Sequence, residues 1–362
     1  MDDLREPMIE TLQPSRWRTF VLYGIAVLLP YNAMISAVDY FIEHFGPGFE
    51  SLNAICLLVP NFTTLFITAF VCKGDNWRSA IVGYLGLLSA CLIMPILRNQ
   101  EIVLVVLAML AVFNGLAQAA INGLGSHDAQ LLTALQTGQG IAGVVSSVVR
   151  IFTKLSSSNL NSSAWCFFWL ASAPVAIALG FLRYEPGRKS TLTQQSTSNL
   201  ILVRTLVLPL FAVFINFVLT LSVFPGLISR VPPRDMACRL TQHWWPVLLF
   251  TVFNLFDLGG KYFSNLPLAR FRGNRGAATL LLLQVARMTL VYAMVSVPVP
   301  DAVTCLIIAI FAFTSGWFGS QGFCIQHDLV HPSLQDQASV LTLFFLLFGI
   351  STGSIVGRML FG

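Results

Sequence analysis

The sequence predicts an all-α protein that crosses a lipid bilayer about eleven times. Of its 362 residues, 56% are hydrophobic and only 10% are charged, whereas soluble domains carry about 25% charged residues. The apolar residues gather in runs of about 20, the length of a membrane-spanning helix, with no alternating barrel pattern. This composition excludes a soluble protein. The net charge of +5 is too small to predict nucleic-acid binding.

The apolar runs define the predicted helices in order along the chain. The first six are Arg18–Phe45, Leu52–Cys72, Ser79–Leu97, Ile102–Leu124, Ala134–Leu155 and Ala164–Leu182. The last five are Leu206–Leu227, Trp244–Phe263, Ala277–Val297, Ala302–Phe323 and Ser339–Leu360. A polar stretch separates the two sets. We therefore predict an N-terminal bundle over residues 1–182, a cytoplasmic linker over 183–199 and a C-terminal bundle over 200–362, a six-plus-five arrangement.

Basic residues predict the orientation, because loops rich in Lys and Arg stay on the cytoplasmic side. The linker contains Arg183, Arg188 and Lys189. The start of the chain contains Arg5, Arg16 and Arg18, and the segment after the eighth predicted helix contains Arg270, Arg272 and Arg275. The N-terminus is then cytoplasmic, and an odd number of spans places the C-terminus outside. The cluster Arg230, Arg234 and Arg239 is the exception. The sequon at Asn161 falls in an outside loop, and its glycosylation is left open.

An aspartate and a lysine lie one helical turn apart inside a strongly apolar segment. Asp257 and Lys261 belong to the run FNLFDLGGK, and Asn254 lies three residues before Asp257. Spacings of three and four residues place these side chains on one helix face. A charge at bilayer depth costs several kcal/mol, by estimates from about 2.5 to 17. This face therefore contacts water, a substrate or other polar helices; the alternative is a purely structural ion pair.

Polar stripes occur on five further predicted helices. Their members are Asn32, Ser36, Asp39 and Glu43; Asn61, Thr64 and Thr68; Asn114, Gln118 and Asn122; Gln139, Gly143, Ser146 or Ser147, and Arg150; and Asn216 with Thr220. Helix packing explains any single stripe, because small and polar residues mediate contacts between membrane helices. Six such helices together predict a polar pathway through the protein. The segments Gly138–Gly143 and Gly349–Gly357 predict close helix packing.

Two arginines, Arg150 and Arg287, also fall inside predicted helices. We interpret Arg287 as the partner of a carboxylate or a helix end, and Arg150 as either a pathway or a structural residue. The acids Asp39 and Asp257 are expected to neutralise such cations. Asp39, Arg150, Asn254 and Arg287 are therefore candidate pathway or coupling residues. His327 and His331 lie four residues apart, the one weak indication of a metal site, and no catalytic dyad or paired catalytic acids occur, so we expect no enzyme, cofactor or metal.

Several segments resemble the equilibrative nucleoside transporters. They are LLPYNAMISAVDYF (Leu28–Phe41), AVFNGLAQAAINGLG (Ala111–Gly125), GQGIAG (Gly138–Gly143), LSVFPGL (Leu221–Leu227), FNLFDLGGKYF (Phe253–Phe263), ARMTLVYAM (Ala286–Met294), SGWFGSQGFCIQH (Ser315–His327) and FLLFGISTGSIVG (Phe345–Gly357). They span nearly the whole chain in the family's order. The resemblance implies eleven helices in a six-plus-five, major-facilitator-like fold, with the N-terminus inside and the C-terminus outside. It also implies a central substrate and alternating access.

The resemblance implies seven substrate-binding residues: Tyr31, Asn32, Ile35, Asn114, Gln118, Asp257 and Lys261. Tyr31 holds the aromatic position that borders the substrate. Gln118 matches the glutamine that hydrogen-bonds the base, and Asp257 with Lys261 matches the two residues that engage the ribose hydroxyls. The chemistry agrees, because a carboxylate accepts from two vicinal hydroxyls and an amide both donates and accepts.

This chain departs from the family pattern at several positions. Lys261 stands where the family has an arginine, so the planar fork is replaced by a point charge. Asn114 stands where many members have a glycine. Arg150 and the sequence of the first predicted helix resemble the protist purine transporters of this family more than its animal members. The central loop is short, and no large loop follows the first helix.

We therefore expect a plasma-membrane permease for purine nucleosides, with nucleobases as further candidate substrates. Facilitated diffusion and proton-coupled uptake are left as alternatives, since Asp39, Glu43 and Asp257 could each carry a proton. The expected partners are the substrate, the lipid bilayer and, in the coupled alternative, protons. Two other interpretations are a facilitator of another polar solute such as a sugar and, less favoured, a polytopic membrane enzyme.

Overall fold

The computed structural model describes residues 14–46, 49–71, 75–157, 159–184, 199–224, 227–234, 239–296 and 299–361. These residues form α-helices joined by short turns, with no strand among them. The predicted linker and the N-terminal basic residue Arg5 fall mostly or wholly outside the described residues. The prediction of an all-α membrane fold is confirmed.

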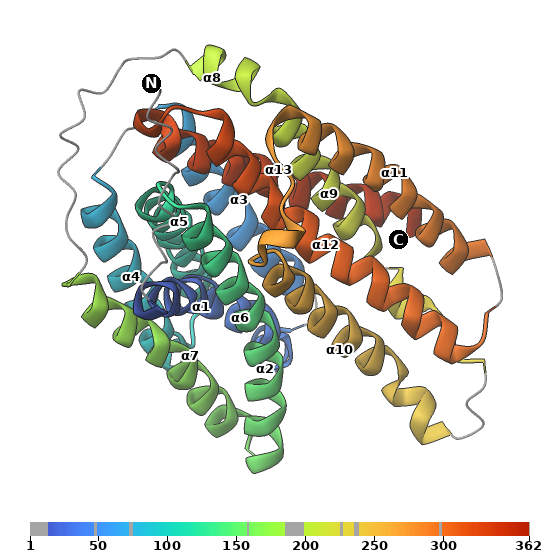
Figure 1. Ribbon diagram of the computed structural model, residues 1–362. Helices are drawn as coiled ribbons and strands as arrows, with labels where there is room; N and C mark the ends of the chain where they lie inside the picture. The colour runs from blue at the N-terminus through green and yellow to red at the C-terminus, as the bar shows by residue number, and fades with distance from the viewer. Residues whose placement is uncertain are drawn as a thin grey trace, which may run out of the picture.

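The helices before the linker are α1 (Pro14–Ser36), α2 (Val38–Phe45), α3 (Phe49–Phe70), α4 (Asn76–Ile93), α5 (Gln100–Gly125), α6 (Ala129–Ser156) and α7 (Leu160–Leu182). The helices after it are α8 (Asn199–Thr205), α9 (Val207–Val223), α10 (Arg239–Phe263), α11 (Gly273–Ser296), α12 (Asp301–Leu329) and α13 (Gln335–Phe361). Short 3₁₀ turns cover Met94–Ile96, Ile228–Arg230, Pro267–Ala269 and Pro332–Leu334. Figure 1 shows their arrangement.

Polar residues in the loops start several of these helices. The side chains of Asp75, Asn99, Asp128 and Asn159 accept hydrogen bonds from backbone N–H groups in the first turns of α4, α5, α6 and α7. The first N–H groups of a helix have no partner within the helix, so such a cap stabilises the start by about 1 kcal/mol. The helices therefore begin a few residues before the apolar runs from which they were predicted.

The first predicted helix is wrong in one respect, because the run Arg18–Phe45 forms two helices. The chain turns at Ala37, where ψ opens to 26° between α1 and α2. Hydropathy does not change at this point, so a continuous apolar run could not indicate the break. The run ends as predicted, since Gly46 has a φ of 87°, a conformation that favours glycine.

Eight helices are long and apolar enough to cross a membrane, within the residues that the structure describes. The helices α6, α9 and α10 are not among them. The helix α9 has only 17 residues. The helix α6 carries the polar stripe that begins at Gln139, and α10 carries Asp257 and Lys261. The polar residues that indicate a pathway are thus the reason why α6 and α10 have a weaker membrane signal, whereas α9 is too short.

The helices form two groups along the chain. In the N-terminal group, α1 packs on α6 and α7, and α5 packs on α3 and α4. In the C-terminal group, α9 packs on α11, α12 and α13, and α10 packs on α12. The groups meet where α6 contacts α10 and α12, and where α13 contacts α3 and α5. Figure 1 shows α6 and α10 meeting near the centre and diverging toward the end of α6 and the start of α10.

Glycines allow the backbones of paired helices to approach closely, as their clustering predicted. A Cβ atom on Gly138 of α6 would lie 2.1 Å from the carbonyl oxygen of Val21 on α1. A Cβ atom on Gly316 of α12 would lie 2.0 Å from the carbonyl oxygen of Asp257 on α10. Small residues bring membrane helices together in this way. The second contact fixes the helix that carries the charged residues.

Alanine at Gly138 is expected to destabilise the contact between α1 and α6 by about 1 to 3 kcal/mol, because the added methyl group overlaps a backbone carbonyl. The apparent Tm of the purified protein in detergent measures this loss. Gly180→Ala is the matched control, since a Cβ atom at this α7 position meets nothing within 4 Å. Equal melting of Gly138→Ala and wild type would contradict the close contact.

Candidate functional site

Asp257 and Lys261 form an ion pair on α10. Lys261 Nζ lies 2.8 Å from Asp257 Oδ2, and the two side chains are 16% and 20% exposed, in that order. The prediction that the two side chains share one helix face is therefore confirmed, and their direct contact is the one that the structural alternative also expects. Because both side chains are partly exposed, a small solute can contact both charged groups. A fully buried, purely structural ion pair would not allow this contact. Neighbouring Leu255 and Phe256 are exposed, as side chains that face lipid would be.

The helix α6 brings the pair close to α1. A Cβ atom on Gly140 would lie 3.0 Å from Lys261 Cδ, and one on Gly143 would lie 4.0 Å from Asn32 Nδ2. Gly140 and Gly143 are one turn apart on α6, so Asn32 of α1 and Lys261 of α10 approach neighbouring points on one helix. The absence of side chains at these two glycines leaves the space that both polar groups enter.

A second polar cluster lies between α5, α1 and α3. Gln118 Nε2 donates to Asn114 Oδ1 at 2.5 Å, and Asn114 Nδ2 donates to the Val27 carbonyl at 2.5 Å. Asn61 Nδ2 also donates to Asn114 Oδ1, at 3.5 Å. Asn114 is fully buried and Gln118 is 5% exposed. The Asn114 amide therefore fixes the orientation of Gln118 by bonding it to the backbone of α1.

Tyr31 lies beside this cluster, and its side chain interacts with that of Asn61 on α3. Asn61 belonged to a predicted stripe but not to the predicted substrate-binding set. The stripe spacing was the signal that could have included it. Gln139 of α6 was omitted in the same way; it is 8% exposed, and its Nε2 has no hydrogen-bond partner among the described residues.

Arg287 of α11 is the centre of a hydrogen-bond network in the C-terminal group. Its Nη1 donates to Asn216 Oδ1 and to Gln284 Oε1, both at 2.7 Å. Its Nη2 donates to Thr220 Oγ1 at 3.1 Å and to the Phe311 carbonyl at 3.2 Å. The guanidinium carbon also lies 4.4 Å from the centroid of the Phe311 ring. This arginine therefore joins α9, α11 and α12.

Electrostatic interaction links Arg287 to the ion pair, because Asp257 lies within Coulombic reach of the guanidinium group. The sequence analysis interpreted Arg287 as the partner of a carboxylate or a helix end. The described contacts differ in kind: the direct partners are neutral oxygens, and the carboxylate acts over a longer distance. A fully buried cation needs such a set of acceptors to compensate for its lost hydration.

Arg150 lies away from these clusters, toward the later part of α6. It is 5% exposed, its Nη1 donates to Ser163 Oγ of α7 at 3.3 Å, and its guanidinium carbon lies 5.3 Å from the Phe167 ring centroid. On the same face of α6, the hydroxyl of Ser146 bonds that of Ser36 on α1 at 3.0 Å. The predicted stripe of α6 therefore contacts α1 and α7 in its second half.

The remaining predicted residues are Ile35, Asn254 and Asp39. Ile35 is 47% exposed on α1, and Asn254 is partly buried one turn before Asp257. The side chain of Asp39 in α2 lies outside the described residues. The structure thus brings Asn32 near the ion pair, and it brings Tyr31 near the Gln118 cluster.

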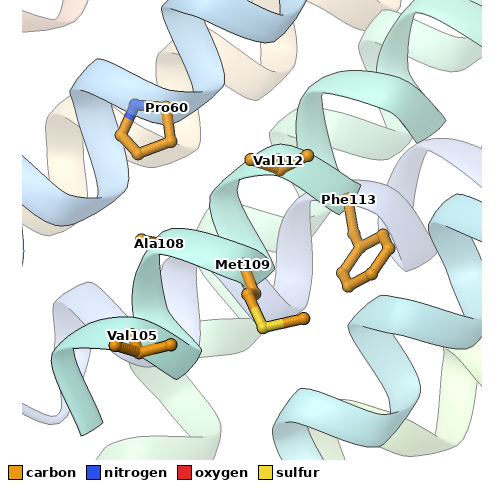
Figure 2. A pocket seen from close by; sticks show the side chains of 6 residues that line it. All are labelled: Pro60, Val105, Ala108, Met109, Val112 and Phe113. Carbon is orange, nitrogen blue, oxygen red and sulfur yellow. The ribbon is translucent and has the colours of Figure 1, made fainter. Parts of the chain in front are cut away.

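An apolar groove lies apart from these polar clusters. It has a volume of about 280 Å³ and is lined by Pro60 of α3 and by Val105, Ala108, Met109, Val112 and Phe113 of α5. Figure 2 shows these side chains along the two helices. Because ligand sites for polar solutes need converging polar groups, this groove is not a candidate site for a polar solute.

Comparison with known proteins shows the family. The model of the family described as "Nucleoside transporter" matches residues 104–199 and 185–360. Equilibrative nucleotide transporter 8 of Arabidopsis thaliana is 24% identical, over 93% of this chain and 92% of its own length. Equilibrative nucleoside transporter 1 of Homo sapiens is 22% identical, over 94% of this chain and 95% of its own length.

Solved structures with a similar fold come from the major facilitator superfamily. The proton:xylose symporter XylE superposes with a TM-score of 0.68 at 10% identity, covering 95% of this chain and 88% of that protein. The fucose:proton symporter FucP of E. coli gives 0.62 at 14% identity, covering 96% and 95%. These similarities confirm the major-facilitator-like fold. Because the family model matches more than half of this chain, the chain belongs to the nucleoside transporter family.

Proposed function

We propose that this protein carries purine nucleosides, and nucleobases as further candidates, across the plasma membrane. The observation that carries the proposal is the partly exposed Asp257–Lys261 ion pair inside an apolar helix. A permanent charge pair at this depth is costly, and its exposure allows a polar solute to reach both groups. Membership of the nucleoside transporter family and the names of the relatives support a nucleoside as that solute.

The proposed roles follow from the chemistry of each group. The Asp257 carboxylate accepts hydrogen bonds from the two vicinal ribose hydroxyls, and the Lys261 ammonium donates to a ribose oxygen. Gln118 recognises the edge of the base, with its amide oriented by Asn114. Tyr31 contributes an aromatic ring to the base pocket.

Transport itself is proposed to occur by alternating access, without covalent chemistry. The bundles over residues 1–182 and 200–362 would rock about the substrate, with residues 183–199 as the cytoplasmic connection. We propose that Asp39, Arg150, Asn254 and Arg287 act in the pathway or in coupling. An N-terminus in the cytoplasm and a C-terminus outside complete the proposed topology.

Uptake of radiolabelled adenosine and inosine into cells without nucleoside transport of their own tests this proposal. We expect saturable uptake that excess hypoxanthine reduces and excess glucose leaves unchanged. Uptake that rises at acidic external pH would favour proton coupling, and uptake independent of pH would favour facilitated diffusion. Competition by glucose, or no purine uptake by protein at the cell surface, would contradict the proposal and favour another polar solute.

A further inference from the structure

Hydrogen bonds join the two helix groups at one end of the molecule. Their members in the N-terminal group are Trp17, Asn76, Asn122, Ser126, Thr133 and Thr137, and those in the C-terminal group are Lys261, Asn265, Asp336 and Ser339. These residues lie at the start of α1, α4, α6 and α13 and at or just beyond the end of α5 and α10. We call this the closed end. In Figure 1, the opposite ends of α6 and α10 diverge.

Asn265 forms most of the contacts at the centre of the closed end. Its Oδ1 accepts from Trp17 Nε1 at 3.3 Å and from Thr133 Oγ1 at 2.6 Å. Its Nδ2 donates to Thr137 Oγ1 at 3.1 Å. One amide therefore bonds to α1 and to two consecutive turns of α6, from a residue just beyond the end of α10.

The same amide also fixes the end of the helix that carries the ion pair. Asn265 Nδ2 donates to the Lys261 carbonyl at 3.3 Å and to the Tyr262 carbonyl at 2.9 Å. The Lys261 carbonyl further accepts from Ser264 Oγ at 2.6 Å and from Thr137 Oγ1 at 3.5 Å. The last carbonyl groups of a helix have no partner within it, so these bonds determine where the final turn lies.

From these contacts we propose that Asn265 is a positioning residue that couples the Asp257–Lys261 ion pair to closure of this end of the protein. The proposal rests on the proposed transport function, because a solute can leave at this end only if the bonds from Asn265 to α1 and α6 break. Their loss shifts the population toward the conformation that is open here. Solute held by Lys261 acts on the same turn of α10, so binding and closure affect each other.

A second set of contacts limits the expected effect. Asp336 at the start of α13 accepts from Ser126 on α5 and, at 3.4 Å, from Asn76 on α4. Ser339 Oγ donates to the Asn122 carbonyl at 3.0 Å. These bonds do not involve Asn265. Its replacement is therefore expected to shift the conformational equilibrium by about tenfold rather than to open the closed end completely.

Modification of a native cysteine measures this shift directly. Cys324 of α12 is 2% exposed and interacts electrostatically with Arg270 and Asp328 of its own group and with Asp128 of the other group, which places it near the closed end. The full-length protein is reconstituted in lipid nanodiscs and treated with a small maleimide. Mass spectrometry of peptides then gives the modification rate of each cysteine, and no substrate is needed.

We expect Asn265→Ala to raise the modification rate of Cys324 about tenfold, while Asn274→Ala leaves it unchanged. Asn274 is an exposed asparagine at the start of α11, in the same part of the chain. Cys91, buried within the N-terminal group, should stay unmodified in every variant. An unchanged Cys324 rate, or equal acceleration at Cys91, would overturn the proposal, the latter because it indicates general unfolding.

Thr133→Val provides a second variant that keeps Asn265 and the side-chain volume. It removes the hydroxyl that donates to Asn265 at 2.6 Å, so a smaller increase at Cys324 is expected. No increase in either variant would overturn the coupling even if Asn265→Ala folds poorly.

Transport from the two membrane faces gives a readout that a general structural defect would not produce. For Asn265→Ala, the apparent KM should rise for solute added at the face opposite the closed end and fall for solute added at the closed end. The reason is that fewer protein molecules then have a binding site open to the face opposite the closed end, and more have a site open at the closed end. Equal changes at both faces would overturn the proposal. If no variant and no wild type carries nucleosides, the proposed function fails, while the Cys324 rates still decide the role of Asn265.

Discussion

Replacement of Asp257 by Asn is expected to lower nucleoside uptake, as Vmax/KM, by roughly a hundredfold. The carboxylate is proposed to hold two ribose hydroxyls, and each hydrogen bond to a charged group contributes about 1.5 to 3 kcal/mol. An amide of the same shape offers one acceptor oxygen and a donor group that opposes the hydroxyl protons. The substitution also leaves Lys261, normally 2.8 Å away, as an uncompensated cation.

This second effect must be separated from the first, because an unpaired charge that is only partly exposed by itself destabilises a protein. The double variant Asp257→Asn with Lys261→Met removes both charges. We expect it to regain surface expression and thermal stability while uptake stays low. Glu101→Gln, at an exposed position in the first turn of α5, is the matched control and should transport normally. Near-normal uptake by the double variant would show that the ion pair is structural and that the solute binds elsewhere.

Replacement of Arg287 by Met is expected to destabilise the protein by about 1 to 3 kcal/mol, the cost of leaving a buried hydrogen-bond acceptor without its donor. The guanidinium group donates to Asn216, Gln284, Thr220 and the Phe311 carbonyl. Methionine fills similar volume but leaves Gln284 Oε1 without the donor that Arg287 supplies, whereas Asn216 Oδ1 keeps its bond from Gln284 Nε2 and Thr220 Oγ1 keeps its bond with Ser315. The loss exceeds what is regained by removing the buried charge, because the cation is already fully hydrogen-bonded at its Nη atoms.

Thermal melting in detergent measures this effect, together with the amount of protein that reaches the membrane. Arg275→Met on the same helix is the control, since Arg275 is exposed near the start of α11. Arg287→Lys should recover little of the lost stability, because a single ammonium cannot reproduce the planar fork that reaches α9 and α12 together. An Arg287→Met protein as stable as wild type would instead mean that the buried charge costs as much as its hydrogen bonds contribute.

The order and length of most helices follow from the sequence, since each apolar run has the length that a bilayer requires. The prediction fails at Ala37, because a single backbone angle breaks the helix there without any change in hydropathy. It is also weakest at the helix starts, where polar capping residues such as Asp75 and Asn99 extend α4 and α5 beyond the apolar run. Capping depends on side-chain hydrogen bonds to the backbone, which a hydropathy pattern does not contain.

Contacts within one helix could also be predicted from the sequence, because a spacing of four residues fixes the distance between side chains. The Asp257–Lys261 ion pair and the Gln118–Asn114 hydrogen bond are both of this kind. Contacts between helices were not. Nothing in the local sequence indicated that Arg287 bonds Asn216, 71 positions earlier, or that Asn265 bonds Trp17, 248 positions earlier.

By itself, the sequence determined that this protein is helical and membrane-embedded and that charged groups lie within its helices, because composition and periodicity are local properties. The tertiary structure decided which of those groups meet. Glycine contacts bring α10 against α12 and α6 against α1, and these packings set the neighbours of the ion pair and join the helices at the closed end. Packing between helices depends on the shapes of two surfaces at once, so neither surface predicts it alone.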